Sequence, residues 1–165
     1  MHSLLVLLNS SQKKKSFSCG KEMLDNYLRN QAKQDVKRKL SACFILADEN
    51  NNIRGYYTLS NAAIPRDLLP EDLRKKLPAS YQDLPATLLG RLAIDRTCQG
   101  QRLGQHLLMD ALKRSFEVSE KIGSMAVIVD PIDEAATKFY QKFGFIPLPD
   151  SGKMFLSMAT LSELF

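Results

Sequence analysis

The sequence predicts an α/β fold in which helices cover both faces of one mixed sheet. Segments of strand length and segments of helical periodicity alternate along the chain, in the order β-α-β-β-loop-β-α-β-α-β. The strands at 88–95 and 125–129 are joined by one long helix, which predicts a parallel pair with a right-handed crossover. No repeat, low-complexity tract or linker divides the chain, so residues 1–165 are expected to form a single domain.

Composition narrows the class of protein further. With 44% hydrophobic and 25% charged residues, the chain is expected to be globular rather than disordered or collagen-like. Its three cysteines are odd in number and lack CxxC spacing, which argues against a disulfide framework or a zinc site and favours a reducing, cytoplasmic setting. Because there are only two histidines, no metal centre is expected.

Three strands are expected in the first half of the chain, at 3–9, 42–48 and 54–63. The Asn-rich turn at 49–52 joins the last two as a hairpin. The apolar run in the first strand is too short for a signal-peptide core or a membrane span, and no longer run follows. We therefore expect no association with a membrane.

One amphipathic helix is predicted over about 20–40, because its apolar residues recur at spacings of three and four. Ser18 is a possible N-cap for this helix, although no capping box accompanies it. A proline-punctuated segment follows the hairpin and is expected to be mostly loop, with a short helix near 71–76. A long loop inside a compact domain is usually functional or mobile.

The second half alternates strand and helix more regularly. After the strand at 88–95, a long helix is expected to end near Gly123 as its C-cap, and the all-apolar run 125–129 predicts a strand covered on both faces. Asp133 is a suitable N-cap for a helix that Gly144 ends. The chain is then expected to finish with strands at 145–147 and 154–158 and a turn at 161–165.

The net charge of +5 is unevenly distributed. Between Ser11 and Leu40 there are nine Lys or Arg residues and three acids, so the rest of the chain is close to neutral. Such a segment indicates a polyanionic partner, with nucleic acid or an acidic protein as candidates, or simply a solvated helix face. Residues proposed to contact nucleic acid are Lys33, Lys37, Arg38 and, inside an otherwise apolar strand, Arg91.

The segment Gln99–Gly104 leads from a strand into the long helix and predicts an anion site. Unpaired backbone N–H groups and the positive end of the helix dipole both favour a phosphate there. The segment lacks a GK[ST] ending, so a Walker-type nucleotide site is excluded. An ordinary strand-to-helix turn is the alternative that the residues alone leave open.

Two motifs in this half of the chain resemble those of the GNAT superfamily of N-acetyltransferases. Gln99-x-x-x-x-Gly104 is similar to the family's acetyl-CoA loop, usually Q/R-x-x-G-x-G/A. Residues 133–145, DEAATKFYQKFGF, resemble its closing helix, N-x-x-A-x-x-x-Y-x-K-x-G-F. The resemblance implies the GNAT fold, a twisted and mostly antiparallel sheet of six to seven strands with a splayed central parallel pair and helices on both faces.

The resemblance also implies acetyl-CoA as co-substrate and assigns the residues that bind it. Backbone groups of the strand are expected to pair with the pantetheine arm, and loop amides to hold the pyrophosphate. The implied set is Leu92, Ala93, Ile94, Gln99, Gly100, Gln101, Arg102, Leu103, Gly104, Gln105, Asp133, Ala136 and Phe139. Two of these depart from the motifs, since Arg102 replaces a glycine and Asp133 replaces the more usual asparagine.

A narrower resemblance extends over nearly the whole chain. The opening Phe17-Ser-Cys-Gly-x3-Leu24-Asp-Asn-Tyr-Leu28, the proline-rich loop and the strand LLGRLAID are similar to the GNAT-type toxins of bacterial toxin–antitoxin pairs. This resemblance implies an enzyme that acetylates the α-amine of aminoacyl-tRNA and so blocks translation. It further implies a ribbon-helix-helix antitoxin as partner and a homodimer.

Tyr140 is the general acid that the family match assigns. A tyrosine with a reference pKa of about 10 stays protonated and can donate to the leaving thiolate, while an α-amine of pKa about 8 needs no strong base. From its pattern alone Tyr140 reads as a core aromatic. A Cys98–His106 nucleophile pair is disfavoured, because nothing in the sequence marks a third group to orient it.

Two further readings of function stay open at the level of sequence. The same fold could acetylate a small amine or a protein N-terminus, although the basic segment speaks against a cationic polyamine. The chain could also be a non-catalytic module that binds RNA or a protein partner, for which Arg102 is the best support.

Overall fold

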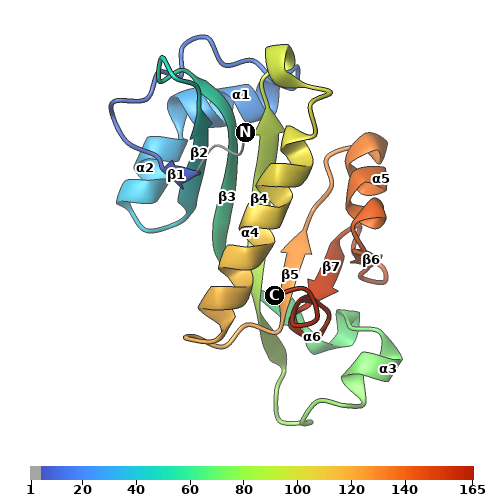
Figure 1. Ribbon diagram of the computed structural model, residues 1–165. Helices are drawn as coiled ribbons and strands as arrows, with labels where there is room; N and C mark the ends of the chain where they lie inside the picture. Colours follow the sequence, from blue (N-terminus) through green and yellow to red (C-terminus); the bar gives the residue numbers. More distant parts are fainter. Residues whose placement is uncertain (1–4) are drawn as a thin grey trace. The chain divides into compact units, whose positions relative to one another are not determined.

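The computed structural model describes residues 5–165 and contains one seven-stranded sheet in the order β1-β2-β3-β4-β5-β7-β6 (Figure 1). Its strands are β1 (Val6–Leu7), β2 (Ala42–Ala47), β3 (Ile53–Pro65), β4 (Asp83–Ile94), β5 (Ala126–Val129), β6 (Ile146–Pro147) and β7 (Met154–Ser157). Its α-helices are α1 (Glu22–Asn30), α2 (Ala32–Lys37), α3 (Glu71–Arg74), α4 (Leu103–Ser119), α5 (Glu134–Lys142) and α6 (Met158–Leu161). The predicted mixed α/β fold is confirmed.

The strand pairing is antiparallel except between β4 and β5. Those two strands run parallel, with Thr87 opposite Val127 and Leu88 opposite Ile128. The helix α4 lies between them in sequence, so the predicted parallel pair is confirmed. β4 continues for six residues past Leu88, to Ile94, and a 3₁₀ turn at Arg96–Cys98 then leads to the predicted anion loop.

Cα positions divide the chain into two units, whose boundaries fall inside β3, β4 and α4. The first unit comprises the described residues of Met1–Ser60 together with Leu89–Ala111, and the second comprises Asn61–Leu88 and Leu112–Phe165. The predicted anion loop and the basic segment belong to the first unit. The predicted closing helix, now α5, belongs to the second.

In the first unit, helices pack against opposite faces of the sheet. A buried cluster on one face joins Phe17 and side chains of α1 and α2 to Tyr56 of β3 and Ala93 of β4. The neighbouring residue Gly55 points to the other face, where a Cβ would meet Leu107 of α4. Alternation along β3 therefore separates the α1–α2 side from the α4 side.

The core of the second unit is built around β5, all four of whose residues are buried. Ala126 and Ile128 pack with Phe155 of β7, Ile64 of β3 and the segment that contains α3. The β5 strand is covered on both faces, as its all-apolar sequence predicts. The aromatic residues of α5 form a separate group, described with the site.

The helix predicted over 20–40 is wrong in one respect, since it is broken into α1 and α2 at Gln31, whose φ of −129° is not helical. The break has a packing consequence. Ala32 is fully buried beyond it, and the Tyr27 hydroxyl donates to Asp35 across it at 2.8 Å. Tertiary contacts thus override a periodicity that fits one continuous helix.

Other predicted boundaries also need correction. Gly123 does not cap α4, which ends at Ser119 in tightened turns, and the backbone of Gly123 has no positive φ. Ser18 does not cap α1, because Lys21 occupies the N-cap position and no side chain caps it. The first strand is only Val6–Leu7 within the described residues, and residues 3 and 4 lie outside them. At the C-terminal end, β7 stops at Ser157, which caps α6.

Gly55 provides a test of the packing between β3, β4 and α4. A Cβ at this position would lie 3.0 Å from Ile94 Cδ1 and 3.3 Å from both the Ala93 carbonyl oxygen and Leu107 Cδ2. We expect Gly55→Ala to lower the free energy of unfolding by about 1–3 kcal/mol, because the backbone oxygen cannot move aside. Gly123→Ala is the control, since its Cβ meets nothing within 4 Å. Equal stability of the two variants in denaturant melts would contradict this packing.

Candidate active site

The end of β4 is bonded to β3 along one edge, and along the other edge its pairing with β5 extends only to Leu88, so we call the edge beyond Leu88 the available edge. The Asp95 N–H donates to the Arg54 carbonyl at 2.8 Å, so the backbone groups of Asp95 and, by alternation, Ala93 point toward β3. Leu92 and Ile94 then direct their N–H and C=O groups to the opposite edge. A substrate that adds to this edge as a further strand would form hydrogen bonds with Leu92 and Ile94. It would form none with the backbone of Ala93, which points toward β3.

The loop between β4 and α4 adopts backbone conformations that place amides outward. Gly100 and Arg102 both have positive φ, at 84° and 61°. Among the hydrogen bonds of residues 5–165, none is donated by the backbone N–H groups of Gly100, Gln101, Arg102, Leu103, Gly104 or Gln105. Successive unpaired amides at the start of a 17-residue helix are suited to an anion such as a pyrophosphate, and the predicted anion site stays a prediction.

The positive φ of Arg102 explains why the family motif has a glycine at this position. A left-handed backbone is available to glycine at little cost and is uncommon for other residues. Arg102 adopts it nonetheless, and its side chain is exposed and makes no ion pair within the described chain. The backbone geometry that the motif requires is therefore preserved in spite of the substitution.

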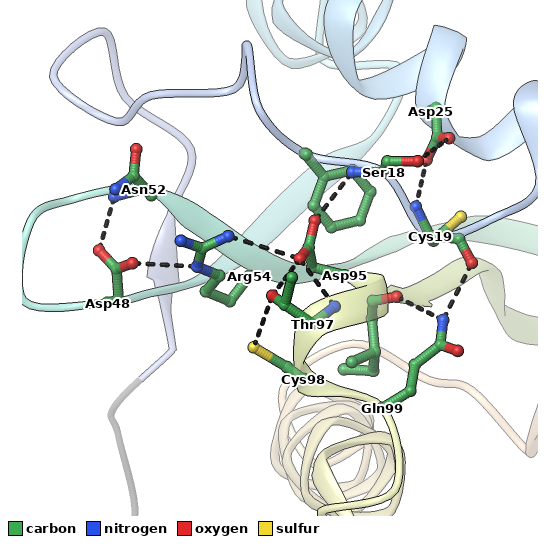
Figure 2. A network of polar contacts seen from close by, with 12 residues as sticks. Ser18, Cys19, Asp25, Asp48, Asn52, Arg54, Asp95, Thr97, Cys98 and Gln99 are labelled. Atoms are coloured by element: carbon green, nitrogen blue, oxygen red, sulfur yellow. Dashed lines mark hydrogen bonds and ion pairs between the residues drawn. The ribbon is translucent and has the colours of Figure 1, made fainter.

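A network of polar contacts fixes the turn that precedes the loop (Figure 2). The Asp95 carboxylate accepts hydrogen bonds from the Ser18 N–H at 2.8 Å and from the N–H and hydroxyl of Thr97. The Arg96 N–H donates in return to the Ser18 carbonyl at 2.8 Å. The Gln99 side-chain nitrogen donates to the carbonyls of Cys19, at 2.9 Å, and Ile94, at 3.1 Å.

Gln99 and Asp95 therefore hold the turn in place, a structural role that the sequence does not predict. Gln99 was expected to bind the cofactor, yet its amide nitrogen is engaged by two backbone carbonyls. Asp95 and Ser18 were not predicted as part of the site. An acidic residue directly after an apolar strand was the available signal for Asp95, whereas the 77-residue separation from Ser18 left none.

The Asp95 carboxylate is ionised in spite of being only 2% exposed. Burial alone would raise the pKa of Asp95, but hydrogen bonds from Thr97 and Ser18, together with nearby Arg54, outweigh it and hold the pKa below its usual range. Arg54 lies 3.4 Å from Asp95 and 2.9 Å from Asp48. The network therefore depends on a charged carboxylate.

In the second unit, α5 presents Tyr140 with its ring buried and its hydroxyl unpaired. The residue is 8% exposed and packs against Phe139 and Phe145, with ring centroids 5.4 and 5.2 Å away. Among residues 5–165 no buried polar side-chain atom lacks a partner, and the Tyr140 hydroxyl makes no hydrogen bond, so that oxygen reaches solvent. Burial raises the pKa of Tyr140 above its usual value and keeps the phenol protonated.

Asp133 acts as the N-cap of α5, as predicted. Its carboxylate accepts from the Ala136 N–H at 2.8 Å, and its carbonyl accepts from Thr137. A helix cap is thus the function that the structure gives this departure from the family's asparagine. Ala136 and Phe139 are half-buried on the same helix, and their predicted contact with acetyl-CoA stays a prediction.

The residues predicted to contact nucleic acid all belong to the first unit. Lys33, Lys37 and Arg38 are exposed on and after α2. Arg91 is half-buried, and its guanidinium carbon lies 3.4 Å from the centre of the Tyr27 ring. Among residues 5–165, no group of three or more His, Cys, Asp or Glu residues is placed to hold a metal ion. Within the same residues, no helix has the length and hydropathy to cross a bilayer.

Comparison with known proteins identifies the family. A sequence model of the acetyltransferase (GNAT) family matches residues 6–145, across both units. The chain belongs to the GNAT acetyltransferase family, and it is an acyltransferase.

Individual relatives are also similar over most of their length. A tRNA-acetylating toxin of Mycobacterium tuberculosis (strain ATCC 25618 / H37Rv) is 35% identical over 130 residues, which cover 79% of this chain and 76% of the toxin. The crystal structure of a Tyr-to-Phe mutant of KacT matches with a TM-score of 0.92, at 30% identity and 98% coverage of both chains. AtaT complexed with acetyl-methionyl-tRNAfMet matches with a TM-score of 0.91, also at 30% identity and 98% coverage of both. AtaTR bound with AcCoA matches with a TM-score of 0.87, at 30% identity, over 98% of this chain and 97% of that one.

The lowered pKa of Asp95 predicts a specific acid sensitivity. Because the folded pKa lies below the unfolded value of about 3.9, this carboxylate stabilises the fold above that pH and ceases to do so as the pH falls through its folded pKa. We expect Asp95→Asn to be less stable than the parent at pH 7 and to lose less stability between pH 5 and 2, as measured by denaturant melts across that range. Parallel pH profiles for the two proteins would contradict the assignment.

Proposed function

We propose that this acetyltransferase acetylates the α-amine of aminoacyl-tRNA and so blocks translation, as the toxin of a toxin–antitoxin pair. The observation that carries the proposal is the likeness, over nearly the whole of both chains, to AtaT in complex with acetyl-methionyl-tRNAfMet. The relative from Mycobacterium tuberculosis, named as a tRNA-acetylating toxin, supports the same substrate class. The exposed cationic residues of and after α2, Lys33, Lys37 and Arg38, also support an RNA substrate.

Acetyl-CoA is the acetyl donor of the proposed reaction. The six unpaired amides of Gly100–Gln105 suit its pyrophosphate, and the available edge of β4 at Leu92 and Ile94 suits the amides of its pantetheine arm. Gly100 has a φ of 84°, a left-handed backbone that glycine adopts at little cost. We assign Gln101, Leu103, Gly104 and Gln105 to the donor through their backbone N–H groups.

In the proposed reaction the acceptor amine needs no strong base, whereas the leaving thiolate needs a proton donor. An α-amine with a pKa of about 7.7–8.0 is partly neutral at physiological pH, so its nitrogen can attack the thioester carbonyl without a strong base. The carbon–sulfur bond then breaks, the thiolate takes a proton, and the nitrogen releases one proton to solvent, from which the proton donor is restored. Tyr140 is the assigned donor of that proton, because its hydroxyl is protonated, reaches solvent and has no partner within the described chain.

The acceptor tRNA is proposed to lie against the basic segment of the first unit. Lys33, Lys37 and Arg38 are exposed and suit phosphate contacts that position the nucleic acid without reading its sequence. Arg91 is proposed as a fourth phosphate contact, nearer to the Leu92 edge. Binding through such contacts is expected to weaken as salt is raised.

The same proposal implies a protein partner, an oligomeric state and a cellular location. We propose a ribbon-helix-helix antitoxin that neutralises the enzyme, a homodimer in solution, and a single functional domain over residues 1–165. The solved structures of AtaT together with AtaR support a toxin–antitoxin partnership. We place the protein in the cytoplasm, where aminoacyl-tRNA is found.

A labelling experiment tests the function directly. Purified protein is incubated with acetyl-labelled acetyl-CoA and, separately, with a full set of charged tRNAs, a peptide with a free N-terminus and a panel of small amines. We expect label on the aminoacyl group of one or more charged tRNAs. Label only on a peptide or a small amine would overturn the tRNA proposal, and failure of acetyl-CoA to bind in calorimetry would favour a non-catalytic module.

The role of Tyr140 is tested by removing its hydroxyl alone. We expect Tyr140→Phe to lower kcat by about 100-fold or more, because general acid catalysis contributes on this scale. The dissociation constant for acetyl-CoA, from calorimetry, is expected to stay within a factor of about two, since the ring and its packing are kept. Phe139→Leu, which alters the neighbouring aromatic residue and leaves the hydroxyl, is the matched comparison. An unchanged kcat for Tyr140→Phe would exclude the proton-donor role.

A further inference from the structure

The Tyr27 ring contacts two other planar groups, Tyr56 and the Arg91 guanidinium. Tyr56 lies on one side with ring centroids 6.3 Å apart and planes at 17°, and Phe17 meets Tyr56 edge-on at 5.7 Å. The Arg91 guanidinium carbon lies 3.4 Å from the Tyr27 ring centre. At that separation the two planes must be close to parallel, because an edge-on guanidinium would bring its hydrogens into the ring. Arg91 therefore stacks on Tyr27, a ring that itself packs against the buried Tyr56.

A hydrogen bond fixes the orientation of the Tyr27 ring. Its hydroxyl donates to the Asp35 carboxylate at 2.8 Å, and the Gln31 side chain approaches the same oxygen at 3.5 Å. Tyr27 is only 5% exposed. Burial, reinforced by the Asp35 carboxylate, raises the pKa of Tyr27 to about 12, so this hydroxyl stays a donor at physiological pH. The Tyr27 ring on which Arg91 lies is thus held by its contact with Tyr56 and by the hydrogen bond from its hydroxyl to Asp35.

The hydrogen-bond donors of Arg91 are not used by the described chain. Within residues 5–165, no carbonyl or carboxylate accepts a hydrogen bond from Arg91, and no acid forms an ion pair with it. A half-buried guanidinium ordinarily finds such acceptors, since desolvated donors left unpaired are costly. Its five N–H groups lie in one plane and match two oxygens of a phosphate at once.

The position of Arg91 along β4 relates it to the acetyl-transfer reaction. It directly precedes Leu92, whose backbone groups point to the available edge of the strand. Its side chain points to the α1–α2 face of the sheet, the face on which Ala93 packs. The exposed Lys33, Lys37 and Arg38 belong to the same two-helix region. A phosphate bound by Arg91 would therefore lie near the strand edge and be continuous with the basic segment.

We infer that Tyr27 is a positioning residue for acceptor recognition: it holds Arg91 flat as a fork that binds a phosphodiester at the single-stranded 3′ end of the acceptor RNA. The inference rests on the proposed function for the identity of the acceptor. The stack supplies orientation before binding, so less side-chain entropy is lost when the phosphate is engaged. A lysine would keep the charge at this position but neither stack as a plane nor donate bidentately.

The test is a double-mutant cycle with Tyr27→Leu and Arg91→Lys. Each single change is expected to raise the KM for charged tRNA about tenfold, the scale of one charge-assisted hydrogen bond, and to leave kcat and the KM for acetyl-CoA unchanged. The double variant is expected to be no worse than either single one, because Tyr27 acts through Arg91. Tyr27→Phe keeps the ring but removes its hydrogen bond to Asp35, so it is expected to raise this KM by about threefold, less than Tyr27→Leu does. Lys121→Gln, an exposed change elsewhere, is the control for charge and handling.

Three outcomes would overturn the inference: an unchanged tRNA KM for Arg91→Lys, multiplicative effects in the double variant, or a loss of kcat without a change in KM. If melting curves show that Tyr27→Leu does not fold, Tyr27→Phe takes its place in the cycle, and an equal effect of Tyr27→Phe on the tRNA KM in the parent and in Arg91→Lys would overturn the inference. Fluorescence anisotropy with uncharged tRNA separates this inference from the proposed function. If the parent acetylates no charged tRNA, the function is wrong, and the effect of Arg91→Lys on RNA binding still supports or refutes the fork.

Discussion

The turn after β4 is held in place by the segment from Phe17 to Cys19, and the site depends on that attachment. Backbone groups of Ser18 bond to Asp95 and to the Arg96 N–H, and the Cys19 carbonyl bonds to Gln99. These contacts come from residues far apart in sequence, so they form only when the first unit is folded. With the turn fixed, the loop that follows can keep its amides unpaired without collapsing onto other acceptors.

The loop carries features that stability alone would not select. Arg102 holds a left-handed conformation, and six consecutive amides from Gly100 to Gln105 have no acceptor among the described residues. Strained backbone and unsatisfied donors gather where a protein binds a ligand, because the surrounding structure can sustain them and the ligand relieves them. Tyr140 shows the same property in the second unit, with a buried ring and a hydroxyl that no residue engages. Each unit therefore contains polar groups that lack a partner among the described residues and that a substrate could engage: the loop amides in the first unit and the Tyr140 hydroxyl in the second.

Local patterns predicted much of this structure from the sequence. The alternation of elements, the parallel pair, the Asp133 cap and the anion loop all arise from interactions within a few residues or from one crossover. The motif around Gly104 and the aromatic helix around Tyr140 were identified by family resemblance, and pattern alone would have left Tyr140 in the core. The break at Gln31 and the absence of a cap at Gly123 were missed, because tertiary packing decides them. The Asp95–Ser18 contact and the stack of Arg91 on Tyr27 join residues 77 and 64 positions apart, and no local signal marks them.

We propose above all that the amides of Gly100–Gln105 bind the pyrophosphate of acetyl-CoA. An NMR titration of uniformly ¹⁵N-labelled protein with acetyl-CoA tests it most directly, with inorganic pyrophosphate titrated in parallel. We expect the backbone N–H resonances of these six residues to move in both titrations, and those of Leu92 and Ile94 to move only with acetyl-CoA. Binding of acetyl-CoA that leaves the loop resonances in place would contradict it.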